Sequence, residues 1–205
     1  DFDFFIHTWE GSDGSSSWES SIDVDKNSII DIYNPRLYDI EKQKLFNNDI
    51  GDYKTILGDI SMIKRVKSMF YSILRCNELK CKYEQDNNFK YDCVIRIRFD
   101  FQIQSPLLLD MDLNKMSIKD EKSHDEYSVN DHIAISNSDN MNIYSNVYND
   151  FGDIYNKEKC HFNPEMILGR HLKINKFDIN KVKIDSIIRR FKSFEKNEEY
   201  WSPHR

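Results

Sequence analysis

The chain has 205 residues, of which 39% are hydrophobic and 31% are charged, and its net charge is -6. This length and apolar content suffice for one sizeable core, and the mildly acidic balance gives no support to a nucleic-acid partner. No run approaches the roughly 20 apolar residues of a membrane span, and the first residues do not resemble a secretory leader. We therefore expect a cytoplasmic protein with no membrane span.

Four cysteines are spread along the chain without a Cys-x-x-Cys pair: Cys76, Cys81, Cys93 and Cys160. This spacing favours reduced thiols over a structural zinc site.

The chain opens on an apolar segment, residues 2–9, which we predict to be a buried strand. Because the chain begins inside this strand, we expect the sheet to lack its first strand. The Gly- and Ser-rich residues 11–17 follow, and they fit either a plain connection or a loop that faces a ligand.

Strands and helices are then predicted to alternate. Residues 60–83 carry apolar side chains at helical spacing and give the clearest helix. Strands are predicted at 27–33, 91–99, 116–118 and 132–136, and helices at 140–155 and 164–172. Residues 36–49 read as a polar helix or irregular segment, and 181–205 as a tail that is basic and then acidic. The expected fold is a single α/β domain over residues 1–205, incomplete at its N-terminus, with a mixed, mostly parallel Rossmann-like sheet flanked by helices.

The strand at 91–99 is the main site signal, because it ends in Arg96, Arg98 and then Asp100. Open α/β sheets bind ligands at the carboxyl ends of their strands, and guanidinium groups suit phosphates. Side chains alternate along a strand, so both arginines lie on one face of it. They could therefore also lie on a solvent-exposed face or pair with acidic neighbours there. Asp100 equally fits a residue that caps a turn.

Five phrases in this order resemble a known family: residues 3–9, 68–73, 91–100, 130–136 and 163–168. Together they resemble the GT-A type glycosyltransferases of bacterial surface-polysaccharide clusters and of large algal viruses such as the chloroviruses. The resemblance spans residues 3 to about 172. It implies a Rossmann-like sheet, a nucleotide-sugar donor and a saccharide or glycan acceptor, in the cytoplasm of a bacterium or of a viral host.

In that family a short acidic motif, commonly Asp-x-Asp, holds a divalent cation, Mn or Mg, that bridges the donor's diphosphate. Here the motif reads Arg98-Phe-Asp100, so an arginine replaces the first carboxylate and metal dependence stays open. The resemblance implies that Asp100 faces the metal or diphosphate, that Arg96 and Arg98 face donor phosphates, and that His204 completes a metal shell.

Two carboxylates are candidates for the base that takes the acceptor's proton, Asp131 and Glu165. Asp131 also fits a turn aspartate before a strand, and Glu165 also fits a favourable charge in a helix's first turn. His7 and Trp9 are candidate donor-binding residues on one face of the first strand, although a histidine there more often belongs to the core.

Two other function classes remain. A non-catalytic carbohydrate-binding or scaffold domain of the same fold is favoured by the missing first carboxylate. Another phosphate-handling enzyme, such as a nucleotidyltransferase or sulfotransferase, is disfavoured because the chain has no Gly-rich phosphate loop of the Walker or dinucleotide type.

Overall fold

A computed structural model describes residues 2–10, 26–42, 44, 46, 60–121 and 125–189. The predicted loop at 11–17 and the candidate metal ligand His204 lie outside these residues.

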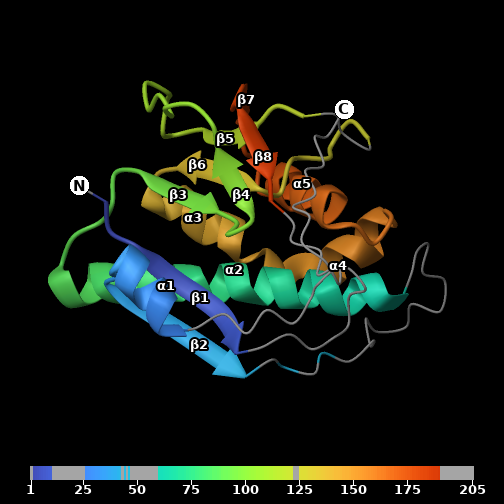
Figure 1. Cartoon of the computed structure of the whole chain (residues 1–205). Helices are drawn as coiled ribbons and strands as arrows, with labels where there is room; N and C mark the ends of the chain where they lie inside the picture. The colour runs from blue at the N-terminus through green and yellow to red at the C-terminus, as the bar shows by residue number, and fades with distance from the viewer. Residues whose placement is uncertain are drawn as a thin grey trace, which may run out of the picture.

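Helix α2 (Ile60–Asn87) is the longest described element and runs through the middle of the molecule (Figure 1). Its residues Ile63, Val66, Phe70 and Ile73 are buried, at the three- and four-residue spacing that puts them on one face. Strands β1 (Phe5–Glu10) and β2 (Leu37–Lys42) pair in parallel and pack against α2. Helix α1 (Lys26–Tyr33) connects them.

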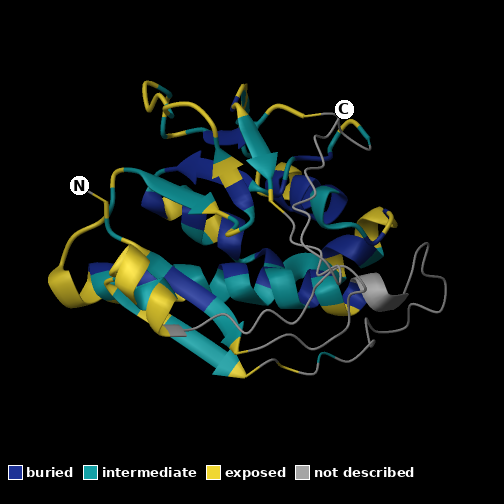
Figure 2. Ribbon diagram, in the orientation of Figure 1, coloured by how far each residue is buried: buried dark blue, intermediate teal, exposed yellow. Residues whose placement is uncertain are grey.

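A four-stranded sheet has the order β3-β6-β5-β7. Its strands are β3 (Val94–Ile97), β6 (Ile133–Ser136), β5 (Met116–Lys119) and β7 (Ile179–Val182). Every residue of β6 is buried, because this strand has neighbours on both sides and is covered on both faces. Buried residues are concentrated in β5, β6 and α5, and Figure 2 shows exposed residues on α1.

Three further helices cover the core: α3 (Ser138–Ser145), α4 (Val147–Glu158) and α5 (Pro164–Ile174). Asn163 caps α5, since its side chain accepts a hydrogen bond from the Met166 backbone N–H, and Pro164 takes the first helical position. Strands β4 (Phe101–Ile103) and β8 (Ser186–Ile188) form a separate antiparallel pair. Phe101 packs with Ile133 and Ile135 in a second buried cluster beside the sheet.

The α/β class is confirmed, but the sheets are not mostly parallel. Among the described strands, β1–β2 and β5–β7 are parallel, whereas β3–β6, β5–β6 and β4–β8 are antiparallel. The helix at 60–83, the strands at 116–118 and 132–136 and the helix at 164–172 are confirmed within a few residues. The opening strand is present as β1, and the strand predicted at 91–99 is confirmed over the shorter β3.

Four predictions of local structure were wrong. Residues 27–33 form α1 rather than a strand, because Asn34, with φ 42°, and Pro35 end a helix as readily as they follow a strand. Part of 36–49 is strand β2, which pairs with β1. The helix at 140–155 is two helices separated at Asn146, whose side chain bonds Asp150. The start of the predicted tail contributes to β7 and contains β8.

Candidate functional site

Strand β3 ends at Ile97, and the chain then turns so that Arg98 and Asp100 lie at the edge of the sheet. The turn is fixed by two backbone hydrogen bonds, from the Arg98 N–H to the His132 carbonyl and from the Phe101 N–H to the Arg98 carbonyl. The Arg98 guanidinium donates to both oxygens of Asp100, with Nε to Oδ1 at 2.9 Å and Nη2 to Oδ2 at 2.7 Å. This two-pronged pair fixes the planes of both groups.

Asp131 lies behind Arg98 and is only 2% exposed. Its Oδ2 is 3.6 Å from Arg98 Nη1, and its backbone carbonyl accepts a hydrogen bond from Arg96. Its Oδ1 lies 3.3 Å from His132 Nε2, but the geometry is not that of a hydrogen bond, and among the described residues this oxygen has no hydrogen-bond donor. A buried carboxylate oxygen without a donor is uncommon, and this one can accept a further hydrogen bond.

His132 also belongs to this cluster, although the sequence did not identify it as a candidate. Its Nδ1 lies 3.0 Å from the Asn130 amide nitrogen, and its Nε2 points toward Asp131. Burial lowers its pKa below 6.5, and the Arg98 charge adds to this, while Asp131 opposes it. The histidine is therefore neutral at pH 7. Its position directly after Asp131 in the phrase 130–136 is a signal that would have found it.

Glu165 joins the same group from the first turn of α5. Burial lowers the pKa of Arg98, but the charges of Asp131, Asp100 and Glu165 outweigh it, so the pKa of Arg98 is raised. The Glu165 backbone carbonyl also accepts from Val129 N–H at 3.2 Å, which ties α5 to the segment before Asp131. The structure thus gathers the predicted residues of β3, β6 and α5 at one edge of the sheet, around a single guanidinium group.

The arrangement does not fit a divalent cation at Asp100. Both oxygens of this carboxylate accept hydrogen bonds from Arg98, and a cation there would have to displace a guanidinium of the same charge sign. Within the described part of the chain, no group of three or more His, Cys, Asp or Glu side chains has the geometry to hold a metal ion.

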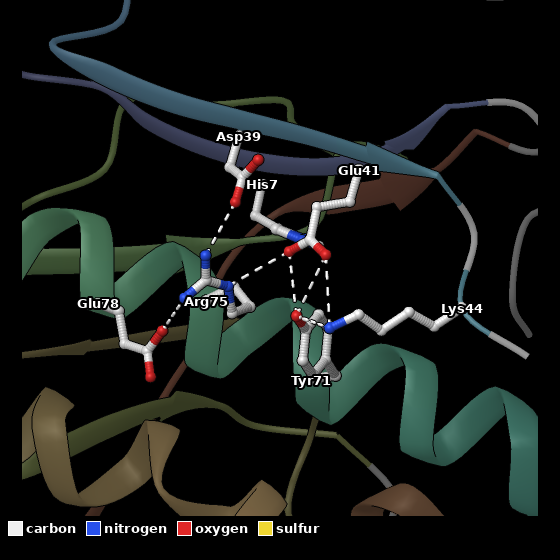
Figure 3. A network of polar contacts seen from close by, with 7 residues as sticks. All are labelled: His7, Asp39, Glu41, Lys44, Tyr71, Arg75 and Glu78. Carbon is white, nitrogen blue, oxygen red and sulfur yellow. Dashed lines mark hydrogen bonds and ion pairs between the residues drawn. The ribbon is translucent and has the colours of Figure 1, made fainter. Parts of the chain in front are cut away.

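His7 lies in a different network, between β1, β2 and α2 (Figure 3), and Trp9 packs against His7 and Tyr71. His7 is buried, and its Nε2 is 3.3 Å from Glu41 Oε1. Glu41 also accepts from the Tyr71 hydroxyl at 3.0 Å and from Arg75 Nε at 3.3 Å, and it lies 3.4 Å from Lys44 Nζ. Burial raises the pKa of Glu41, but these donors and charges outweigh it and lower the pKa to about 2.

The same network ties β2 to the helix beneath it. Arg75 donates to Asp39 at 2.9 Å and pairs with Glu78 on its own helix (Figure 3). Trp9 stacks on Tyr71 with ring centroids 5.4 Å apart. Most polar atoms of this network pair with one another, which favours the core interpretation of His7 and gives Trp9 a packing role. Among the described residues, the buried His7 Nδ1 has no hydrogen-bond partner.

No protein-family model matches this chain, and no curated protein matches its sequence. Among the described residues, no helix combines the length and the apolar character needed to cross a bilayer.

Proposed function

We propose that this chain is a glycosyltransferase that moves a sugar from a nucleotide-sugar donor to a saccharide acceptor. The observation that carries the proposal is the buried Asp131 carboxylate, with one oxygen lacking a donor, directly beside the guanidinium of Arg98. A proton acceptor and a phosphate-binding cation are two groups that an inverting sugar transfer from a nucleotide sugar uses.

In the proposed reaction the acceptor hydroxyl donates a hydrogen bond to Asp131 Oδ1. As its oxygen attacks the anomeric carbon of the donor, its proton passes to the Asp131 carboxylate. The bond between the anomeric carbon and the diphosphate oxygen breaks, and the nucleoside diphosphate leaves with the bonding electrons. Arg98, assisted by Arg96, stabilises the negative charge that grows on the diphosphate. Glu165 is the alternative base.

The exposure of Arg98 supports a role in phosphate binding, although the carboxylates of Asp100, Asp131 and Glu165 act on the same guanidinium. Its side chain is 26% exposed, whereas that of Asp131 is 3% exposed, so the guanidinium lies on the solvent side of the buried carboxylate. A diphosphate approaching the edge of the sheet would meet the cation first. It would share Arg98 with Asp100 through the donors of the planar guanidinium.

A second candidate is a carbohydrate-binding domain without turnover. The two-pronged Arg98–Asp100 pair favours it, because each side chain there already has a partner. The two candidates differ in whether a nucleotide is bound at all.

The deciding experiment is a thermal-shift screen with UDP-, GDP- and TDP-sugars, with and without Mn. A ligand at about 100 times its Kd stabilises a protein by about 2.7 kcal/mol, which is roughly 5 to 10 °C for a chain of this size. We expect at least one donor to stabilise the protein without Mn. Stabilisation that requires Mn would contradict the version of the site built on arginine, and no stabilisation by any donor would contradict the transferase proposal.

Two variants locate the binding. Arg98→Lys keeps a positive charge but loses the planar fork, and we expect it to reduce the donor-induced shift. The matched control is Arg36→Gln, which removes an exposed arginine paired with Asp3 at the surface and should leave the shift unchanged.

A further inference from the structure

A second site lies outside the Arg98 cluster, in a hollow of about 380 Å³. It is bounded by the segment that precedes Asp131, by the C-terminal end of α5 and by β7. Its volume falls in the lower part of the range of small-molecule sites, about 300 to 1,000 Å³. None of the residues proposed to bind the donor lines it.

The hollow is positively charged in a chain whose net charge is -6. Lys173, Lys176 and Lys181 line it and are exposed, whereas Glu126 is the one carboxylate among its lining residues. Lys173 is held in place at the wall, because its Nζ lies 3.8 Å from the centre of the Tyr127 ring.

The wall that carries Tyr127 is fixed in shape. Asp125 Oδ1 accepts from the backbone N–H groups of Tyr127 and Ser128, and Asp125 Oδ2 accepts from Arg170 Nη2 at 2.6 Å. On α5, Gly169 lets the Tyr127 carbonyl approach the helix so closely that a Cβ at this glycine would lie 1.7 Å from the carbonyl oxygen. A wall held in this way loses little conformational entropy when a ligand binds.

The hollow also extends toward Asn130, the residue before Asp131. A smaller hollow adjoins it, shares Val129, Ile179 and Lys181 with it, and extends to Asn130. The Asn130 amide contacts His132, which lies beside Asp131. The two hollows therefore run along one face as far as Asn130, the residue before Asp131, and Glu121 lines the smaller one.

We propose that the hollow binds a sugar that carries a carboxylate or phosphate group. The apolar side chains of Val129, Phe177 and Ile179 suit the C–H face of a sugar ring, and the lysines that line the hollow suit an anionic substituent. Because the adjoining hollow reaches Asn130, next to Asp131, the bound sugar would be an anionic acceptor, and this second step rests on the proposed function. Anion binding itself does not.

The test is isothermal titration calorimetry without donor, using tetragalacturonate, glucose 6-phosphate and the neutral maltotetraose. We expect either anionic sugar to bind more tightly than maltotetraose. Lys173→Gln/Lys181→Gln should weaken anionic binding by about tenfold or more, since it removes two charge-assisted contacts. The matched control Lys64→Gln/Lys157→Gln removes two exposed lysines on α2 and α4 and should change the affinity by less than about twofold.

Three results would overturn the inference: no binding of either anionic sugar by the wild-type protein, equal binding of maltotetraose, or equal weakening by the control pair. Chemical shifts of the Gly169 and Phe177 amides on titration provide a second measurement that does not depend on the variants. The titration contains no donor, so it tests anion binding separately from sugar transfer. If the protein binds an anionic sugar here but transfers no sugar, the binding site is supported and only the proposed function is contradicted.

Discussion

The close contact between Gly169 and Tyr127 makes a prediction about stability. An alanine at position 169 would place its Cβ 1.7 Å from the Tyr127 carbonyl oxygen, so the backbone of one of the two segments must move. The hydrogen bonds of Asp125 and its pair with Arg170 resist that movement. We expect Gly169→Ala to lower the free energy of unfolding by about 3 kcal/mol, as in severe overpacking.

The matched control is Gly152→Ala in the interior of α4, where a Cβ would meet nothing within 4 Å. Alanine there should raise the free energy of unfolding by about 0.5 to 1 kcal/mol, because it restricts the unfolded chain. Urea unfolding followed by circular dichroism measures both, and the two substitutions should differ by about 4 kcal/mol. If Gly169→Ala is as stable as the wild type, the wall of the hollow is not held as described.

Three further predictions concern charged and titratable groups. Burial raises the pKa of Asp125, but hydrogen bonds from Arg170 and Ser128 outweigh it and lower this pKa from 3.8 to about 2. After allowing for the partial exposure of Asp125, Asp125→Asn should lower the free energy of unfolding by about 1 to 2 kcal/mol at pH 7. In urea unfolding, that cost should shrink as the pH falls from 4 toward 2, and a cost independent of pH would contradict the assignment. Asp131→Asn should lower the rate of sugar transfer by about 100-fold or more while donor binding persists, and an unchanged rate would exclude it as the base. Burial lowers the pKa of three histidines below 6.5: His7, His132 and His171. The unfolded chain therefore takes up protons first, so the melting temperature should fall as the pH drops below about 6.5, and a constant value between pH 7 and 5 would contradict their burial as neutral groups.

The sequence predicted elements best where one local signal dominated. Helix α2 follows from apolar residues at helical spacing, and α5 from Asn163 and Pro164 at its start. Helix α1 was missed because isoleucines in a short segment are compatible with either structure, and only tertiary context chose the helix. Strand β2 was missed because its charged residues Asp39 and Glu41 point to partners on α2, which no local pattern reveals.

The sequence predicted which residues belong to the candidate site better than it predicted the contacts between them. The order of residues in β3 and β6 pointed to Arg98, Asp100 and Asp131, and the structure places all three together. The sequence did not show that Arg98 would occupy both oxygens of Asp100, since that depends on the turn after β3. It also did not reveal the lysine-lined hollow, whose walls come from residues about 50 positions apart.

The central claim is that Arg98 binds the diphosphate of a nucleotide sugar. The most direct measurement is ³¹P NMR of UDP-, GDP- and TDP-sugars titrated with the wild-type protein, Arg98→Lys and the Arg36→Gln control. We predict that both diphosphate resonances of at least one donor shift with the wild type and the control, and that Arg98→Lys reduces these shifts. Resonances that do not move with any donor, or that move equally with Arg98→Lys, would contradict the claim.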